Sequence, residues 1–504
     1  NNIVGNGKLN ALNAVQNTPD GGGSGTPVEA GKLIAGDGAP DEYFGNAVAV
    51  NGDYAVVGAH FDDDNGWGSG SAYVFHWNGT NWTQEAKLIG SNTSSYDFFG
   101  SSVAIDGEIA IIGAPGDAVG GAAYVFRRTG VTWNQETILT ASDAASNDNF
   151  GTAVSLSGDT ALVGAPGDYL GTGAAYIFKR NGGNWTELTK LTANDGVALD
   201  HFGSSVAIEG ETAVAGAKDH YANGAVYVFG VDGNSWELEA QLTASDGSAG
   251  DMFGASISLN GNTIVVGARF DDDNGLDSGS AYVFRKQGNS WNEEAKLTPI
   301  DGAADDRFGM VAVKGGVVLV GATHDDDNGL DSGAAYVFTR NGTDWSQLAK
   351  VLPGDGHAGD WFGSSVVLGY QHFLVGSPYD NDNGSDSGSA YVFDFTVTVI
   401  HDGLNPFAAI PGKFVLYQNY PNPFNPSTTI RYQLPRSSEV ALDIYNLLGQ
   451  KIESLVDGWQ APGEYHVQWD GRSEKGTVVS SGIYIYRLKV NGGIVKSRRM
   501  ILMK

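Results

Sequence analysis

The sequence predicts an all-β protein in which a seven-bladed β-propeller is followed by a small Ig-like β-sandwich. Glycine supplies 73 of the 504 residues, a share that suits short strands joined by tight turns and disfavours helices. A Phe-Gly pair recurs seven times at intervals of 51 to 55 residues, which is typical of a repeated supersecondary unit. After Ile400, glycine and aspartate become scarcer and a second series of short strands begins. The expected parts are a flexible arm at 1–27, the propeller at 28–398, a linker at 399–411 and the sandwich at 412–504.

Each repeat contains four short strands in a fixed order. The Phe-Gly pair opens an apolar run such as Phe99–Ile105, a Gly-Ala turn and an Ala-Tyr-Val-Phe strand follow, and the fourth run reads like Trp291–Leu297. Four such runs, separated by Gly, Asn and Asp, predict a four-stranded antiparallel blade. The recurring positions are Phe44, Phe99, Phe150, Phe202, Phe253, Phe308 and Phe362, and Tyr73, Tyr124, Tyr176, Tyr227, Tyr282, Tyr336 and Tyr391.

The position of the fourth-strand sequence relative to the first and last repeats favours a closed ring over the alternative, a linear solenoid. Its Lys-Leu ending occurs at Leu33, before the first Phe-Gly pair, and is missing after Tyr391. A chain of this kind can close a ring by pairing its first strand with its last blade, which removes the exposed sheet edges. A solenoid would instead need distinct polar caps.

The negative charge is concentrated in the repeats. Residues 1–400 hold 17 Lys and Arg against 50 Asp and Glu, whereas residues 401–504 hold 12 against 8. Such an acidic body repels phosphate backbones and attracts divalent cations, so we expect no nucleic-acid partner. The chain has no run of 18 apolar residues, so we expect no transmembrane segment, and without cysteine it has no disulfides or thiolate metal sites.

The Phe-Gly pairs and Gly-Ala-Pro turns resemble the FG-GAP repeat family, known from integrin α-chains and many bacterial extracellular proteins. The resemblance covers roughly residues 28–395, and the proline of the turn is kept at Pro115, Pro166 and Pro378. It implies a propeller outside the cell, with calcium bound in the loop between the second and third strands.

Repeats one, five, six and seven carry a dense acidic loop at that place. Calcium takes six to eight oxygen ligands from a loop turned sharply at glycine, so these carboxylates suit calcium as a cofactor. The alternative is that Asp and Asn form turns here and face solvent, as we expect for the short loops of the other three repeats. Counted back from the glycine, the acids depart from the Asp-x-Asp-x-Asp-Gly register usual in the family. The predicted metal ligands are Asp62, Asp64, Asp271, Asp273, Asp277, Asp325, Asp327, Asp331, Asp380, Asp382 and Asp386.

Two further positions recur in the repeats. An acid two residues before each Phe-Gly pair is predicted to cap a turn rather than to form a ring of ligands. A tryptophan once per repeat is predicted to pack between blades, whereas Trp67 and Trp361 break that register and are candidates for exposed contacts. The acids are Glu42, Asp97, Asp148, Asp200, Asp251, Asp306 and Asp360, and the regular tryptophans are Trp82, Trp133, Trp185, Trp236, Trp291 and Trp345.

The C-terminal part predicts a sandwich of about seven strands. The Tyr-Pro-Asn-Pro-Phe-Asn-Pro segment ending at Pro426, the turn 446–450, the strand that begins at Ser481 and the basic-apolar end 496–504 together resemble a type IX secretion C-terminal sorting domain. The resemblance implies the type IX secretion machinery as a partner and passage across the outer membrane of a Gram-negative bacterium. An ordinary accessory sandwich is the alternative.

The arm ends in a Gly-Ser tether that begins at Gly21. We hypothesise that Ile3–Val15 adds as a strand to a neighbouring subunit and builds a homopolymer. Packing of this segment on its own propeller is the alternative.

The sequence shows no local signature of a catalytic triad or of a glycosidase. We therefore expect a secreted, non-catalytic surface protein for adhesion or for an extracellular structure, with a surface glycan or a protein as ligand. The alternatives are a dedicated carbohydrate-binding protein and a polysaccharide hydrolase that uses carboxylates on the propeller face.

Overall fold

The computed structural model describes residues 27–117, 119–233, 235–369, 371–395, 414–434, 438–460, 463–473, 477–490 and 493–503. In this part of the chain the structure is almost entirely β, with strands β1 to β35 and only two helical turns, α1 (Asp168–Gly171) and η2 (His220–Ala222). No helix in these ranges is long and apolar enough to span a membrane. The predicted donor strand and the linker at 399–411 lie outside the described residues.

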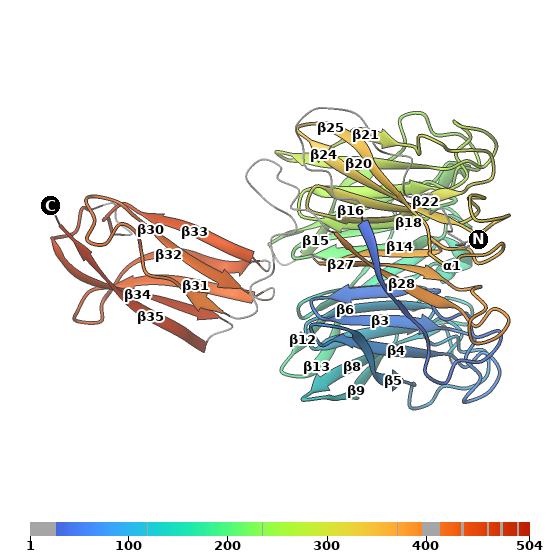
Figure 1. The fold of residues 1–504 in the computed structure, drawn as a ribbon, viewed down its shortest axis with the longest axis horizontal. Coiled ribbons are helices and arrows are strands. Elements are labelled where there is room, and N and C mark those ends of the chain that lie inside the picture. The colour runs from blue at the N-terminus through green and yellow to red at the C-terminus, as the bar shows by residue number, and fades with distance from the viewer. Residues whose placement is uncertain are drawn as a thin grey trace, which may run out of the picture.

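Seven antiparallel sheets of four strands form the blades of the predicted propeller (Figure 1). In blades 1 to 6 the strand order follows the chain, so each of these blades is a simple meander. The first three blades are β2 (Val48–Asn51), β3 (Tyr54–Ala59), β4 (Ser71–Trp77) and β5 (Trp82–Leu88); β6 (Ser102–Asp106), β7 (Ile109–Ala114), β8 (Ala122–Thr129) and β9 (Thr132–Leu139); and β10 (Ala153–Ser157), β11 (Thr160–Ala165), β12 (Ala174–Asn181) and β13 (Asn184–Leu191). Blades 4 to 6 are β14 (Phe202–Glu209), β15 (Thr212–Ala217), β16 (Ala225–Asp232) and β17 (Ser235–Leu242); β18 (Ser256–Asn260), β19 (Thr263–Ala268), β20 (Ser280–Gln287) and β21 (Ser290–Leu297); and β22 (Phe308–Lys314), β23 (Val317–Ala322), β24 (Ala334–Asn341) and β25 (Asp344–Val351).

Blade 7 closes the ring with the two ends of the repeat region. Its order is β1 (Pro27–Leu33), β28 (Ser389–Phe395), β27 (His372–Ser377) and β26 (Ser365–Leu368). Strand β1 pairs antiparallel with β28, from Pro27 opposite Phe395 to Leu33 opposite Ala390. The closed ring predicted from the phase of the fourth strand is therefore confirmed, and the solenoid alternative is wrong.

The Phe-Gly pair joins neighbouring blades. Phe99 is fully buried and packs edge-on against Tyr124 at a ring separation of 5.2 Å. Its backbone forms a parallel bridge with Gly70, which belongs to the preceding blade. A Cβ atom on Gly70 would lie 2.0 Å from the carbonyl oxygen of Phe99, so only glycine permits this approach. The recurrence of the pair thus reflects close backbone packing between blades.

The acids two residues before each Phe-Gly pair cap turns, as predicted. The Asp97 carboxylate accepts the backbone N–H of Ser94 at 2.6 Å, and the other six acids accept the N–H three residues earlier in the same way. All seven acids are buried. Their recurrence is explained by the turn that enters each innermost strand.

The regular tryptophans pack between blades, as the indole of Trp345 in blade 6 shows. Its N–H donates to Glu294 of blade 5 at 3.0 Å, and the same carboxylate accepts two N–H groups of Arg340. Trp133 and Trp185 make the matching bond to a glutamate of the preceding blade.

The C-terminal strands form two facing sheets around one hydrophobic core, with Trp469 and Tyr486 at its centre. The Asn-Pro-Phe segment packs on the end of the chain, because the N–H of Phe424 donates to Ile501 and its carbonyl accepts the N–H of Met503, both at 2.9 Å. The seven strands agree with the sandwich predicted from the sequence. One sheet contains β29 (Val415–Leu416), β30 (Thr428–Leu434) and β33 (Gly463–Trp469), and the other contains β32 (Lys451–Gln460), β31 (Ser438–Tyr445), β34 (Gly482–Val490) and β35 (Gly493–Leu502).

Candidate functional site: the loop face of the propeller

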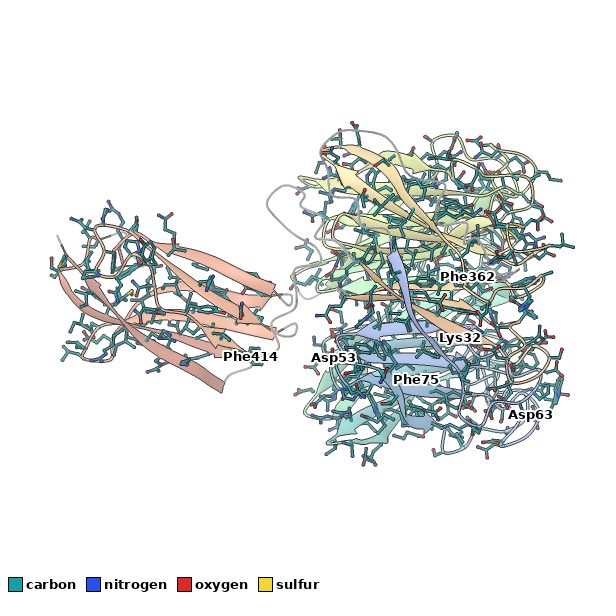
Figure 2. All side chains as sticks on the ribbon, viewed as in Figure 1. Lys32, Asp53, Asp63, Phe75, Phe362 and Phe414 are labelled. Atoms are coloured by element: carbon teal, nitrogen blue, oxygen red, sulfur yellow. The ribbon has the colours of Figure 1, made fainter. Side chains whose placement is uncertain are left out.

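The propeller has two unlike faces. One carries the tight turns between the first and second strands of each blade, where Asp53 lies, and the other carries the long loops between the second and third strands, where Asp63 lies (Figure 2). We call the second the loop face. A central cavity of about 250 Å³ is lined by residues at or just before the start of all seven innermost strands, among them Ser101, Ser204 and Ser364. The turns that lead into these strands from the loop face surround the entrance of this channel.

Aromatic rings gather at the channel entrance on blades 7, 1 and 2. Each ring contacts the next with centroid separations of 4.4 to 5.7 Å, and the pairs Tyr379–Tyr43 and Trp67–Tyr96 cross the blade boundaries. Trp67 and Tyr96 at one end are 55% and 54% exposed, so this end offers flat apolar surface to solvent. We call this set the aromatic arc; it contains Trp361, Tyr379, Tyr43, Phe61, Phe98, Trp67 and Tyr96.

The backbone turn explains why these side chains surround the entrance. Tyr43, Phe98 and Trp361 each precede the Phe-Gly pair and adopt positive φ angles of 55°, 55° and 52°. Their carbonyl oxygens accept the N–H of the third residue onward, which already lines the channel. Sequence reasoning identified Trp67 and Trp361 as contact candidates, and the structure places both in the arc, with Trp361 half-buried.

The arc continues into a basic segment on blades 6 and 5. The ring of His324 lies 5.0 Å from Trp361, and Arg307 donates to His324 Nε2 at 3.1 Å. The guanidinium groups of Arg307 and Arg269 lie 5.6 and 4.9 Å from the ring of Phe270. Among the described residues Arg269 forms no salt bridge. The Arg269 side chain is partly exposed to solvent. The surrounding protein nevertheless reduces its hydration, and this desolvation, together with the charge of Arg307, lowers its pKa.

A second recurring feature of the loop face is a lysine held by aspartates. In blade 5, Lys296 Nζ contacts Asp246 at 2.8 Å, Asp271 at 3.0 Å and also Asp273. Asp271 and Asp273 come from the acidic loop, Asp246 from the connection that enters the blade, and Lys296 from the fourth strand directly opposite Tyr282. The tyrosine hydroxyl lies 2.9 Å from Asp271 and 2.7 Å from Asp246, within hydrogen-bonding distance of both carboxylates. We call this arrangement a lysine cluster.

The same cluster recurs in four other blades. In blade 1, Lys87 Nζ lies 2.7 Å from both Asp62 and Asp64 and 2.9 Å from Asp37. The first loop aspartate is buried in every case, and the lysine is opposite the recurring third-strand tyrosine of its own blade. The remaining clusters are Lys350 with Asp325, Asp327 and Asp301; Lys32 with Asp380, Asp382 and Asp355; and Lys190 with Asp168 and Asp143.

Titration of these groups is governed by the close pairing. Burial alone lowers the pKa of Lys296, but its hydrogen bonds to the three carboxylates outweigh burial and raise the pKa above its usual range. Burial likewise raises the pKa of Asp246, and the bonds from Lys296 and Tyr282 reverse that shift and hold the pKa below its usual range. Lys296 and Asp246 therefore both stay charged at neutral pH.

The structure places the predicted calcium ligands in two different environments. The first and third loop aspartates, such as Asp325 and Asp327, meet at the lysine. The later acids do not join them: the backbone N–H groups of Asp277, Asp331 and Asp386 bond to the residue at the second loop position. In the described ranges, only one set of three acidic or histidine side chains has donor atoms within 4.8 Å of one another, and it is Asp305, His324 and Asp331. Calcium binding by these loops therefore stays a prediction.

The set of Asp305, His324 and Asp331 suits an internal ion-pair network better than a metal. Because Arg307 donates to Nε2 of His324, the ring proton belongs on Nδ1, which lies 3.1 Å from Asp331. A protonated Nδ1 has no lone pair for a metal. Arg307 also pairs with Asp305 at 3.1 Å, which places a positive charge beside the two carboxylates.

Sequence reasoning missed the five lysines. Each stands next to an apolar residue at the end of a fourth strand, so recurrence was a usable signal. The lysine of blade 5 is 25 residues from Asp271, however, and 50 from Asp246, and only the folded blade brings the three together.

The family comparisons agree with this architecture. A model described as FG-GAP repeat matches residues 27–75, 82–126, 133–178, 185–229, 236–284, 291–338 and 345–393, more than half of the chain. A model described as FlgD Ig-like domain matches residues 425–493. Among solved structures, the crystal structure of Sqt1 from Saccharomyces cerevisiae is 11% identical, with a TM-score of 0.41 over 74% of this chain and 99% of that one. With seven matched repeats arranged as seven blades, the chain belongs to the FG-GAP repeat family.

Proposed function

We propose that this chain is a secreted, non-catalytic adhesion protein that binds acidic surface polysaccharide at the entrance of the propeller channel. FG-GAP propellers are often extracellular or adhesive and are generally not enzymes. The observation that carries the proposal is the continuous line of side chains from Tyr96 to Arg269. Aromatic rings stack on the apolar faces of sugars, and guanidinium groups bind carboxylates through paired N–H donors.

The charge distribution supports an acidic ligand at this one place. The repeats carry a large excess of acid, so an anion is repelled from most of the surface. Arg269 is an exception because it lies beside a second arginine and forms no salt bridge among the described residues; the charge of Asp219 only partly offsets the effects of burial and of Arg307 on its pKa. A uronate carboxylate would relieve the repulsion between Arg269 and Arg307, while its sugar ring lies along the arc.

Binding to defined polysaccharides tests the proposal. The purified chain is passed over beads that carry alginate or polygalacturonate, with cellulose and chitin as neutral comparisons. We expect retention on the polyuronates, weakened about tenfold or more by Trp67→Ala, as for an aromatic side chain that contributes strongly to binding. Arg269→Ala should reduce the preference for acidic over neutral polymers. Tyr221→Ala is the matched control, because Tyr221 is 68% exposed in the equivalent loop of blade 4, outside the arc.

Three results would contradict the proposal. They are no retention on any of the four polymers, equal binding by Trp67→Ala and the unchanged chain, and equal loss in Tyr221→Ala. Turnover of a polysaccharide by the purified chain would favour the hydrolase alternative instead.

Export by the type IX machinery of a Gram-negative bacterium is the second part of the proposal. Its support is the contact between the Asn-Pro-Phe segment and the chain end, two segments that carried the resemblance to a sorting domain: Phe424 is 2% exposed and bonds to both Ile501 and Met503. Removal of residues 414–504 should leave the propeller inside a type IX-competent host. Surface display of the shortened chain would contradict this part.

Assembly through the N-terminal arm is the third part. Its support is the sequence of the arm alone, an apolar segment joined to the propeller by a Gly-Ser tether. Deletion of residues 1–20 should abolish or shorten any polymer seen by electron microscopy, whereas assemblies of unchanged length would contradict it.

A further inference from the structure

We infer that the lysines of blades 1, 5, 6 and 7 take the place of the calcium ions expected in their acidic loops, and that Lys190 supplies the same internal cation to the shorter loop of blade 3. The loops of blades 1, 5, 6 and 7 are the ones for which the sequence predicted calcium. In all four, the first and third loop aspartates converge on a lysine ammonium group rather than on an empty space.

The ammonium group has as many N–H donors as there are carboxylates around it. A lysine Nζ has three N–H donors, and in blade 7 Lys32 Nζ lies 3.0 Å from Asp355, 2.9 Å from Asp380 and 2.6 Å from Asp382. The ammonium group also lies over the ring of the facing tyrosine, with Nζ 4.7 Å from the ring centre of Tyr391. The side chain is 16% exposed, so the carboxylates screen the charge from water.

The fit to calcium is poor while the lysine is present. Calcium needs six to eight oxygen ligands, and the inner carboxylates already bond to the ammonium group and to the tyrosine. In blade 5, for example, Asp271 accepts from Ser280, Tyr282 and Lys296 at 2.9, 2.9 and 3.0 Å. An ammonium group and a divalent cation would also repel each other at this distance.

The two blades without a lysine supply independent support. In blade 2, Ile138 is opposite Tyr124, and Asn92 stands where the other blades have the connecting aspartate. In blade 4, Gln241 is opposite Tyr227, and His220 replaces the first loop aspartate. One of the two inner carboxylates is thus lost in each blade that lacks the lysine, while Asp117 in blade 2 and Asp195 in blade 4 remain bonded to the tyrosine. A freely exchanging metal would not require this match between the fourth strand and the loop of the same blade.

Thermal unfolding of the full chain tests the inference. The unchanged chain should melt at the same temperature in EDTA and in millimolar calcium, because a ligand that does not bind the folded state cannot stabilise it. Lys296→Met leaves Asp246, Asp271 and Asp273 without a cation and should lower Tm by about 5 °C or more in EDTA. Millimolar calcium should recover part of that loss, and magnesium at equal ionic strength should recover less.

Two matched variants complete the experiment. Gln241→Met changes the equivalent position of blade 4, which has no lysine, and should show neither a loss of that size nor a calcium response. The double variant Lys296→Ile with Asp246→Asn copies the residues of blade 2 and should be more stable in EDTA than Lys296→Met. If Lys296→Met does not fold, this double variant still tests the charge match.

Two results would overturn the inference. One is a rise in Tm of the unchanged chain with calcium relative to EDTA, which would show divalent sites despite the lysines. The other is a double variant no more stable than Lys296→Met, or no more foldable where Lys296→Met fails to fold, because the lysine would then matter for packing rather than for charge.

Discussion

Closure of the ring rests on β1, and Leu33→Ala should open it locally. Leu33 is 3% exposed and packs in a cluster that joins blade 7 to blade 1, with Leu374 and Val392 on one side and Phe44 on the other. Truncation of a buried leucine to alanine costs about 3 kcal/mol. Strands β1 and β28 are neighbours in blade 7, but the rest of the propeller lies between them in the sequence. We therefore expect the substitution to destabilise mainly β1, which can detach while the other blades stay folded.

Amide hydrogen exchange, read by mass spectrometry, measures this opening. A loss of about 3 kcal/mol corresponds to roughly a hundredfold faster exchange, which we expect only in β1 and β28. The matched control is Leu242→Ala in blade 4, where Leu242 is 4% exposed and the fourth strand follows β16 directly in the chain. The control should lower global stability by a similar amount without selective exchange. Uniform acceleration in Leu33→Ala, or none in β28, would refute closure by β1.

Two further predictions concern single positions. Burial, together with the charge of Asp62, raises the pKa of Glu42 from 4.5 to about 7, against the opposing bond from a backbone N–H. The folded state therefore binds more protons between these values, so the contribution of Glu42 to stability should fall by up to about 3 kcal/mol as pH rises from 4.5 to 7. In urea titrations at several pH values, Glu42→Gln should show a smaller fall than the unchanged chain by this amount, because Asp306 and other buried acids with raised pKa values keep their own contributions. An unchanged slope would disprove the assignment. Gly70→Ala places a Cβ 2.0 Å from the carbonyl oxygen of Phe99, whereas Gly79→Ala, also at positive φ, meets nothing within 4 Å. Melting curves should show a larger loss for Gly70→Ala, and equal losses would contradict the packing role of the Phe-Gly bridge.

Most of the fold was predictable because it repeats. The Phe-Gly pairs, third-strand tyrosines and once-per-repeat tryptophans are short-range patterns, and the same physical requirement produces each of them seven or six times. The phase of Leu33 even predicted which strand closes the ring. The capping acids were predictable for the same reason. An acid that recurs in every repeat is expected to stabilise a structural feature common to all blades, here the turn that enters the innermost strand.

The features that distinguish one blade from another were harder to predict. The aromatic arc depends on Tyr379 of blade 7 lying 5.0 Å from Tyr43 of blade 1, a contact across the closure point between residues 336 positions apart. The lysine clusters combine a loop, a fourth strand and a connection that are tens of residues apart. The acidic loops were visible in the sequence, but the cation that faces them was not, which is why calcium was the natural prediction.

Polyuronate binding in the presence and absence of a chelator tests the central claim most directly, because it combines the arc with the internal cations of the loop face. The affinity of the unchanged chain for alginate or polygalacturonate is measured by surface plasmon resonance in EDTA and in millimolar calcium, using oligomers too short to form calcium gels. The account predicts saturable binding of equal affinity in both buffers, since lysines hold the loops that support the arc. Absence of saturable binding, or binding that disappears in EDTA, would contradict it.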